Sequence, residues 1–519
     1  MDSVLKVLSN SEIPSFNINA NRVNFLSSPT EFYKTLKLLI STAQRDITLA
    51  TLYIGSDDLS KDLVREINAA LLKNSKLQCS ILMDYNRSQR GSQNSLSILS
   101  SIERQQQLQC YLYRPFLYKK QPAFFLPSRW NEGIAVFHMK IYIADNSVIL
   151  SGANLSEQYF VNREDRYVLI KNSPKFISYL RNLLKIIGNH SYKLVSGNLQ
   201  PSTCSSSLYQ DINNLQKNLS CQRFDCNKTR IFCSLQLPDV GYKNDSNLTL
   251  NLFKSLTKQE EMWLATGYFN LPKVYQQAIL KSRAKINILA GSQETNGFFN
   301  DPSFARNIPP LYELLLQRFS HKISHSRFER LLISEFYRQD WTFHAKGIWI
   351  ESPNENNVSI CAFGSPNYGV RSMFRDVESH FILCTKNKTL REQIAKDRIR
   401  LFNYAIPFCN RKYKMVFRNS QSLTVFRQLS QQLRRTFGKN YRQNEGYLYL
   451  ISEFRRNSVT DATFCRAEEE LLSRARDYTR YLHSVFTLQE LRGEFQKGER
   501  SAADAAKIVG LKLAEEKEF

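Results

Sequence analysis

The sequence of 519 residues lacks several features that would assign it to a familiar class of protein. No run of 18 apolar residues occurs, so no segment is expected to span a bilayer, and any membrane contact would be peripheral. The 15 prolines and 18 glycines are too few for a collagen-like or generally disordered chain. The ten cysteines include no C-x-x-C pair and no cysteine–histidine quartet with zinc spacing, so a structural zinc site is not expected.

Acidic residues are scarce relative to basic ones. The chain has 47 Asp and Glu against 71 Lys and Arg, a net charge of +24. Such a surplus indicates an acidic partner: a nucleic acid, an anionic membrane surface or a phosphorylated substrate. Residues 1–22 have neither the apolar core of a secretory signal nor the basic residues of a strong mitochondrial presequence, and we interpret them as a targeting or a disordered segment.

Helical and strand patterns alternate along the first half of the chain. Residues 30–45 have apolar side chains at helical spacing and residues 46–55 form an apolar run typical of a buried strand. Residues 59–73 are again helical in pattern, and residues 77–86 are again strand-like. This order predicts an α/β fold in which helices flank a sheet built from βαβ units.

The same order returns later in the sequence. The strand motif L-A-T-x-Y, which begins at Leu49, recurs at Leu264, an offset of 215 residues. A polar, Ser- and Asn-rich stretch separates the two copies, and from about residue 424 the pattern becomes charged and helical. We therefore predict two homologous halves, at residues 23–200 and 231–418, joined by a linker at residues 201–230. A C-terminal helical module is predicted at residues 420–519.

Two of the seven histidines stand in closely similar surroundings, 206 residues apart. Each begins an H-x-K motif that is followed by an acid and by an asparagine after glycine. The members are His138, Lys140, Asp145 and Asn154 in the first half, and His344, Lys346, Glu351, Ser365 and Asn367 in the second.

The spacing has a chemical consequence. Residues i and i+2 of a strand share a face, so the histidine and lysine of each motif project together. Two such halves facing one another would bring two imidazoles and two ammonium groups into one pocket. A phosphodiester substrate needs that set, because one imidazole can attack phosphorus, the other can protonate the leaving oxygen, and the lysines can hold the phosphate oxygens.

A second acid lies eleven residues after each asparagine, at Asp165 and at Glu378. We expect these two carboxylates to bond the far nitrogen of the catalytic imidazoles and fix their orientation. Asp145 and Glu351 belong to the repeated catalytic motif and are expected to organise the strand ends and their lysines. A single H-x-K motif would arise easily by chance, whereas two copies with matched acids and asparagines would not. We assign the other histidines, at positions 190, 321, 325, 380 and 483, to solvated or core positions.

These two blocks resemble the phospholipase D superfamily, whose signature is H-x-K-x4-D with a downstream G-S-x-N. Within it the chain is most similar to eukaryotic phosphatidylglycerophosphate synthases, from about Val23 to Phe417, in phrases such as LMDYNRSQRG, WTFHAKGIWI and GSPNYGVRSMFRDVES. Two departures are Gly-Ala-Asn in the first block and Glu351 where Asp is usual. The resemblance implies two αβα sandwich halves around one active site.

The resemblance also implies a reaction. His138 would attack the phosphatidyl phosphorus of CDP-diacylglycerol, and CMP would leave with a proton from His344. Glycerol-3-phosphate would then attack the phosphohistidine, with His344 as base, and neither a metal nor another cofactor is needed. The arginines just after the motifs are candidate anchors for the acceptor's phosphate, although ion pairing with neighbouring acids is an equal alternative. They are Arg163, Arg166, Arg371 and Arg375.

The C-terminal segments resemble another family. Residues 425–435, 447–471 and 495–513 are similar to the small LYR-type factor for mitochondrial ATP synthase assembly. This resemblance implies ATP synthase assembly proteins as partners of residues 420–519. A helical appendage that packs on the enzyme or the membrane is the alternative.

Three functional hypotheses follow. The first is phosphatidyl transfer at the mitochondrial inner membrane, with the chain bound peripherally to its anionic surface and with no nucleic acid as partner. The second keeps the site for a phospholipase D-type phosphodiesterase or nuclease, and the third is a basic membrane scaffold without activity. Residues 111–125, which are basic and aromatic, are a candidate membrane contact or else a buried aromatic loop.

Overall fold

The computed structural model describes residues 1–115, 135–217, 219, 228–302, 304–323, 330–352 and 358–408, with isolated positions after residue 429. The chain divides into two compact units, Met1–Asn410 and Arg411–Phe519. The predicted helical module at 420–519 falls almost wholly outside the described residues, as does most of the candidate membrane loop at 111–125. No helix in the described ranges is both long and apolar enough to cross a bilayer.

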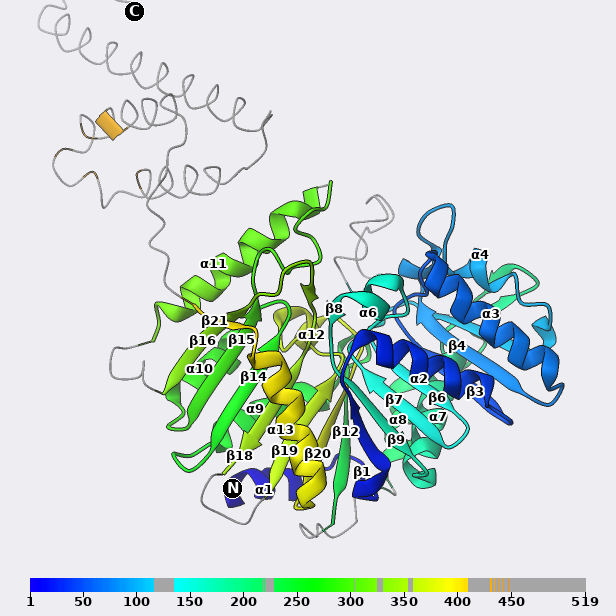
Figure 1. The fold of residues 1–519 in the computed structure, drawn as a ribbon, viewed down its shortest axis with the longest axis horizontal. Coiled ribbons are helices and arrows are strands. Elements are labelled where there is room, and N and C mark those ends of the chain that lie inside the picture. The colour runs from blue at the N-terminus through cyan, green and yellow to red at the C-terminus, as the bar shows by residue number, and fades with distance from the viewer. Residues whose placement is uncertain are drawn as a thin grey trace, which may run out of the picture. The chain divides into compact units, whose positions relative to one another are not determined.

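The first sheet carries the order β11-β10-β5-β4-β3-β6-β7-β9-β2 (Figure 1). Its pairs β3–β4 and β4–β5 are parallel, while β3–β6, β6–β7, β7–β9 and β9–β2 are antiparallel. The strands are β2 (Val23–Leu26), β3 (Asp46–Ala50), β4 (Gln78–Asp84), β5 (Leu108–Tyr113), β6 (Ile141–Ala144), β7 (Ser147–Ser151), β9 (Tyr167–Lys171), β10 (Tyr192–Val195) and β11 (Asn198–Gln200).

The second sheet repeats this arrangement, with the order β1-β12-β20-β19-β18-β14-β15-β16-β21 and β13 paired to β12. From β16 to β12 it matches the first sheet from β5 to β2 strand for strand. Its strands are β1 (Ser15–Asn17), β12 (Arg230–Leu237), β13 (Tyr242–Lys243), β14 (Glu261–Thr266), β15 (Lys285–Gly291), β16 (Leu331–Phe336), β18 (Gly347–Glu351), β19 (Ser359–Gly364), β20 (Glu378–Thr385) and β21 (Ala405–Pro407).

Helices cover the faces of both sheets (Figure 1). Helix α2 shows why the local sequence specifies its element: Ser28 caps its first turn, Pro29 begins it, and Phe32, Leu36 and Ile40 form one buried face. The described helices of the first unit are α1 (Asp2–Ser9), α2 (Pro29–Ser41), α3 (Asp58–Lys73), α4 (Ser95–Leu99), α6 (Glu157–Val161), α7 (Pro174–Asn189), α8 (Leu208–Lys217), α9 (Asn244–Ser255), α10 (Lys273–Lys281), α11 (Ile308–Ser320), α12 (Val370–Phe374) and α13 (Lys388–Phe402).

The two halves share a central core. One cluster of buried side chains joins Val168 of β9, Leu180 of α7, Ile231 of β12, Phe381 of β20 and Ile394 of α13. Each half has a further core of its own on the outer side of its sheet. The predicted α/β architecture, with two similar halves packed together, is therefore what the structure has.

Two segments differ from our expectation. Residues 1–22 are folded rather than disordered: α1 buries Val4 and Leu8, and β1 pairs with β12 at an edge of the second sheet. Residues 201–230 are more than a linker, because α8 within them buries Leu208 and Ile212 against the core. Both segments are rich in Ser and Asn, and that composition conceals the few apolar residues that hold them.

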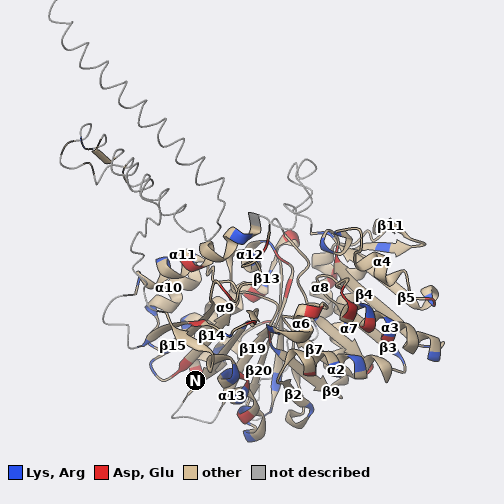
Figure 2. Cartoon of the chain, turned by 45° about the horizontal axis from the view of Figure 1, so that its top comes forward, with Lys and Arg blue, Asp and Glu red and all other residues tan. Residues whose placement is uncertain are grey.

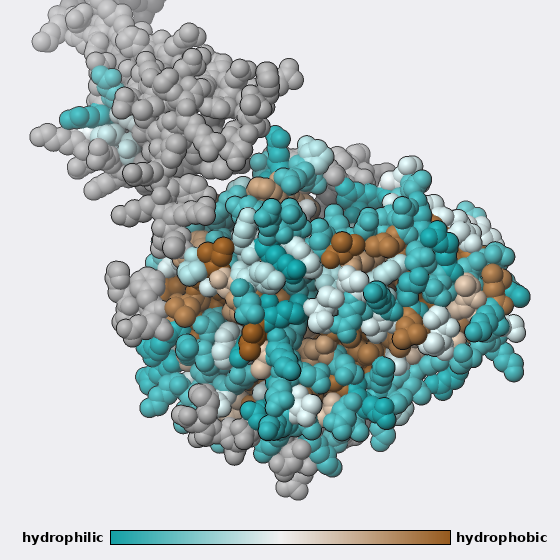
Figure 3. Space-filling model, in the orientation of Figure 1, coloured by the Kyte–Doolittle hydropathy of each residue, from teal (hydrophilic) through white to brown (hydrophobic). Residues whose placement is uncertain are grey.

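Figure 2 shows how the charged residues of the described ranges are distributed in one view. Basic and acidic residues occur side by side on both halves (Figure 2). The face seen in Figure 3 is mostly hydrophilic, with small scattered hydrophobic patches.

Candidate active site

The two histidines are held where the halves meet. The backbone N–H of His138 donates to the Val377 carbonyl at 2.8 Å, and the Val377 N–H donates to Val136 at 2.9 Å. In the other half, the N–H of His344 donates to the Glu164 carbonyl at 2.8 Å, beside the short parallel pair of β8 (Arg163–Glu164) and β17 (Thr342–Phe343). Each histidine is therefore anchored to the opposite half.

The carboxylates are exchanged in the same way. Nδ1 of His138 lies 2.9 Å from Oε2 of Glu378, and Nδ1 of His344 lies 2.7 Å from Oδ2 of Asp165. All four side chains are buried. The structure thus brings each of the two predicted orienting acids to an imidazole of the opposite half. In each case the acid directly follows the residue whose carbonyl accepts the histidine N–H.

Burial shapes the charges in this pocket. Desolvation lowers the pKa of His138, although Glu378 opposes it, and lowers the pKa of His344 well below its usual value with help from Lys346, Arg163, Lys140 and His138. Desolvation also lowers the pKa of Lys346 to about 8. The influence of His138 and Lys140 on His344 indicates that the two motifs form one electrostatic site.

The two carboxylates are not equivalent. Desolvation alone would raise the pKa of Glu378, but His138 and Lys140 outweigh it and the pKa is lowered, while Ser372 Oγ donates to Glu378 Oε1 at 3.0 Å. The pKa of Asp165 is raised, chiefly by desolvation. Gly152 adjoins Asp165 so closely that a Cβ there would lie 2.7 Å from Oδ1, so no side chain fits at that position.

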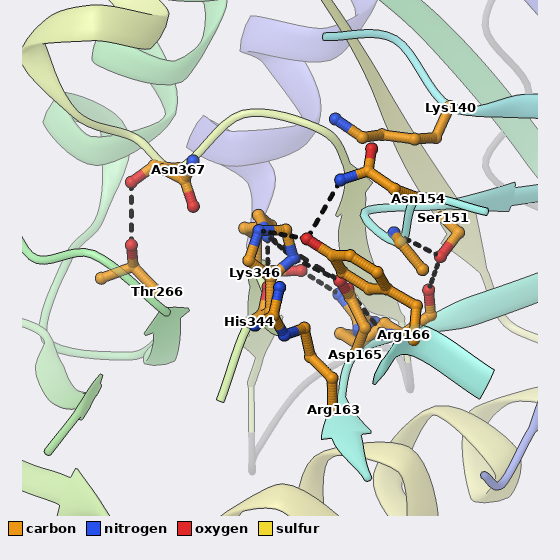
Figure 4. A network of polar contacts seen from close by, with 12 residues as sticks. Lys140, Ser151, Asn154, Arg163, Asp165, Arg166, Thr266, His344, Lys346 and Asn367 are labelled. Atoms are coloured by element: carbon orange, nitrogen blue, oxygen red, sulfur yellow. Dashed lines mark hydrogen bonds and ion pairs between the residues drawn. The ribbon is translucent and has the colours of Figure 1, made fainter. Parts of the chain in front are cut away.

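Both lysines fold back toward their histidines. Nζ of Lys140 donates to the His138 carbonyl at 2.6 Å. Nζ of Lys346 donates to the His344 carbonyl and lies 3.8 Å from Asp165 Oδ2 (Figure 4). Buried ammonium groups are costly unless anions accompany them. The pair is therefore suited to a substrate that brings negative charge.

The asparagines point into the same region. Nδ2 of Asn154 donates to the Tyr159 hydroxyl at 3.0 Å, and the Asn367 carbonyl accepts from Thr266 at 2.9 Å (Figure 4). Oδ1 of Asn154 and Oδ1 of Asn367 are both buried, and neither has a hydrogen-bond partner among the described residues. Ser365 instead bonds the backbone of Ser379, the residue that follows Glu378 in β20.

Asp145 and Glu351, which we grouped with the catalytic residues, lie outside the site. Asp145 follows β6 at the end away from Lys140, and its carboxylate accepts the backbone N–H groups of residues 44, 45 and 46 at 2.8, 2.8 and 3.1 Å. Glu351 ends β18 and pairs with Arg398 at 2.8 Å. Each acid stands across the length of a strand from its lysine, so it orders the strand end and does not contact the lysine.

The four candidate arginines separate into different roles. Arg166 is sealed in the core against Asp397 at 2.8 Å and above the Trp349 ring at 4.1 Å. Arg371 pairs with Asp376 at 2.9 Å, and Arg375 is exposed. Arg163, which is 8% exposed, donates to Thr342 Oγ1 at 3.0 Å, and its guanidinium lies 4.6 Å from the Tyr159 ring centre.

Aromatic residues that we did not predict line the pocket. The Tyr159 hydroxyl lies 3.4 Å from Nε2 of His344, and the Tyr268 ring packs edge-on to the same imidazole at 5.7 Å. Tyr53 contacts Ser156 Oγ through its hydroxyl at 3.2 Å. Tyr53 and Tyr268 are the tyrosines of the repeated L-A-T-x-Y motif, so their repetition was a usable signal for the site.

Two α/β halves that each supply H-x-K, an asparagine and a crossed carboxylate define the phospholipase D-like class of protein. Residues 36–186 match a family described as "Cardiolipin synthase, PLD-like domain". The fold is similar to the crystal structure of phosphatidylserine synthase from Haemophilus influenzae, with a TM-score of 0.59 and 20% identity over 78% of this chain and 91% of that one.

Curated relatives give a narrower assignment. The mitochondrial CDP-diacylglycerol–glycerol-3-phosphate 3-phosphatidyltransferases of Gallus gallus and Homo sapiens are each 32% identical, over 75% of this chain and 79% of theirs. The enzyme of that name from Saccharomyces pastorianus is 30% identical, over 77% of this chain and 85% of its own. The chain belongs to the CDP-diacylglycerol–glycerol-3-phosphate 3-phosphatidyltransferase family.

Proposed function

We propose that the protein transfers the phosphatidyl group of CDP-diacylglycerol to glycerol-3-phosphate, giving phosphatidylglycerophosphate and CMP. The observation that carries the proposal is the crossed pair of buried carboxylate–imidazole contacts, 2.9 Å and 2.7 Å long, flanked by two buried lysines. That set supplies a nucleophile, an acid–base group and charge stabilisation for displacement at phosphorus.

His138 is the better nucleophile of the two. Its Nδ1 is engaged by Glu378, which places the proton there and leaves a lone pair on Nε2. Nε2 of His344, in contrast, lies 3.4 Å from the Tyr159 hydroxyl. The anionic Glu378 also stabilises the positive charge that His138 acquires when it becomes a phosphohistidine.

The reaction then balances in two steps. Nε2 of His138 bonds to the phosphatidyl phosphorus, the bond from phosphorus to the CMP oxygen breaks, and His344 gives that oxygen its proton. In the second step a glycerol-3-phosphate hydroxyl loses its proton to His344, its oxygen bonds to phosphorus, and the bond to His138 breaks. Negative charge of the bound pyrophosphate raises the pKa of His344, so that it can carry the proton it must donate.

The direct test supplies the full-length protein with CDP-diacylglycerol micelles and labelled glycerol-3-phosphate. Lipid-soluble label with equimolar CMP is expected, and His138→Ala should abolish both. His321→Ala, a change at an exposed histidine, is the matched control. DNA cleavage without transfer would select the nuclease alternative, and turnover retained by His138→Ala would remove it as nucleophile.

Arg163 anchors the phosphate of the acceptor. It is buried and, among the described residues, no carboxylate lies within ion-pair distance of it, unlike Arg166 and Arg371. A buried cation without an anion is costly, and a phosphate beside it would remove that cost. A Cβ at Gly297 would lie 2.5 Å from its guanidinium, so this glycine makes room for the arginine.

Kinetics can separate this role from general disruption. Arg163→Gln should raise the KM for glycerol-3-phosphate by at least about tenfold, the worth of one charge-assisted contact, with little change in the KM for CDP-diacylglycerol. Transfer to glycerol, which has no phosphate, should be unaffected. The exposed Arg375→Gln serves as the control. An unchanged KM for glycerol-3-phosphate would contradict the assignment.

The setting of the reaction is a membrane, since one substrate is a lipid. The chicken and human relatives are named mitochondrial. We place this chain peripherally on the anionic surface of the inner mitochondrial membrane, held by its net charge of +24. Fractionation of mitochondria should find it with membranes and release it at high salt or alkaline pH, and extraction by detergent alone would contradict this placement.

Residues 420–519 assist ATP synthase assembly, as their resemblance to an LYR-type factor implies. Deletion after residue 420 should spare lipid synthesis and impair assembly of ATP synthase. Loss of lipid synthesis in that variant would make the segment part of the enzyme instead.

A further inference from the structure

Three side chains with metal-binding chemistry converge outside the active site. They are His190, at the C-terminal end of α7, Cys204, in the loop after β11, and Asp211, in the first turn of α8. One ligand atom from each lies within 4.8 Å of the other two. None of the three takes part in the phosphatidyl transfer described above.

The contacts meet at a single ring nitrogen. Nε2 of His190 lies 2.8 Å from Oδ2 of Asp211 and 3.6 Å from Sγ of Cys204. A catalytic Cys–His–Asp triad would use opposite nitrogens of the imidazole, one for the thiol and one for the carboxylate. Here the thiol and the carboxylate approach the same nitrogen. That nitrogen holds at most one proton, so it cannot donate to both groups. Ligands converge in this way around a shared cation.

The spacings suit a tetrahedral ion. Bond lengths of about 2.3 Å to sulfur and about 2.05 Å to nitrogen or oxygen place tetrahedral N and S ligands about 3.6 Å apart, and N and O ligands about 3.3 Å apart. The observed separations of 3.6 Å and 2.8 Å need a shift of only about half an ångström at the carboxylate.

A supporting hydroxyl links two of the three groups. Ser206 Oγ donates to Oδ2 of Asp211 at 2.6 Å and lies 3.1 Å from Sγ of Cys204. Hydrogen bonds from neighbouring groups commonly orient metal ligands in this way. The backbone N–H of His190 is also fixed, at 3.1 Å from the Ile187 carbonyl.

We propose that His190, Cys204 and Asp211 bind one thiophilic divalent cation, with Zn²⁺ as the best match to a sulfur, nitrogen and oxygen set. A fourth position would be left to water. The ion would fasten the loop around Cys204 to α7 and α8, at the start of the segment that joins the two halves. This site could not be predicted from the sequence, because the ligands are 14 and 7 residues apart and form no recognised spacing.

Cobalt substitution tests the proposal directly. The full-length protein, freed of metal with a chelator, is titrated with Co²⁺. We expect one equivalent to produce visible bands of tetrahedral Co²⁺ together with a thiolate-to-cobalt charge-transfer band, and Zn²⁺ to abolish both. Cys204→Ser should remove the charge-transfer band, and Asp211→Asn should weaken Zn²⁺ binding at least about tenfold.

Controls address the other cysteines of the chain. Cys221→Ser and Cys226→Ser should leave the cobalt spectrum and the stoichiometry unchanged. Because Cys204 is exposed, Cys204→Ser should fold normally, which circular dichroism would verify. A charge-transfer band that persists in Cys204→Ser, or binding below one equivalent in the parent protein, would overturn the site.

Discussion

The crossed carboxylates make a quantitative prediction for Glu378→Gln, a change in the second half that should disable the histidine of the first. Oε2 of Glu378 lies 2.9 Å from Nδ1 of His138 and both groups are buried. Two unit charges at 2.9 Å interact by about 6 kcal/mol at an effective dielectric constant of about 20. The neutral imidazole gains little of this energy, whereas the cationic phosphohistidine gains all of it.

Loss of the Glu378 charge should therefore lower kcat. At about 1.36 kcal/mol for each factor of ten, the upper limit is about 10⁴-fold in kcat. Glutamine keeps a polar contact to the ring, so we expect a decrease of about 10³- to 10⁴-fold with little change in the KM values. Release of CMP from CDP-diacylglycerol measures the effect, and circular dichroism checks the fold.

Asp165→Asn should affect the other histidine, and the choice of leaving group distinguishes the two variants. A phosphatidyl p-nitrophenol substrate expels p-nitrophenolate, which needs no proton from His344. Asp165→Asn should therefore regain most of the first step with this substrate, and Glu378→Gln should not. A Glu378→Gln enzyme within about tenfold of the parent, or identical responses of both variants, would refute the assigned roles.

Two further predictions concern charge in the interior. The kcat/KM should decline above pH 8 as Lys346, whose pKa is lowered to about 8, loses its proton. Because this pKa is below the value of 10.5 in the unfolded chain, Lys346 contributes more to stability as the pH rises from 8 to 10.5. The decline in kcat/KM therefore cannot come from unfolding through this group. A kcat/KM that stays flat to pH 10 would contradict the prediction. Arg166→Met should lower the free energy of unfolding by about 3 kcal/mol, because buried Asp397 then keeps only its contact with Arg400 at 3.2 Å, while Arg166→Met with Asp397→Leu should recover most of this loss. Urea denaturation measures both, and equal stabilities for the single and double variants would argue against a buried ion pair.

Local periodicity made much of this fold predictable. Helix α2 begins one residue before the predicted segment 30–45 and ends within it, and β4 lies within 77–86, because amphipathic spacing and apolar runs depend only on neighbouring residues. The H-x-K motifs were predictable for the same reason, since their chemistry resides in residues two positions apart. The repeat of the strand motif at Tyr53 and Tyr268 then indicated two similar halves.

What the sequence could not show is how the halves dock. Asp165 and His344 are 179 residues apart, and no local spacing encodes their contact. Arg163 and Arg166 are three residues apart and looked equivalent, yet one faces the imidazoles and the other is sealed against Asp397. Asp145 carried the motif's signature but ends a strand that leads away from the pocket.

The exchange of partners predicts that neither half would act by itself. The carbonyl that holds the His138 backbone belongs to Val377, the residue before Glu378, and the carbonyl that holds His344 belongs to Glu164, the residue before Asp165. Position and orientation of each imidazole are thus set by the same two-residue segment of the opposite half. Because each ring and its carboxylate belong to different halves, a relative shift of the halves would separate both pairs and disrupt the shared pocket for phosphorus. Since the core between the sheets also draws on both halves, the energy that docks them is the energy that aligns the catalytic groups.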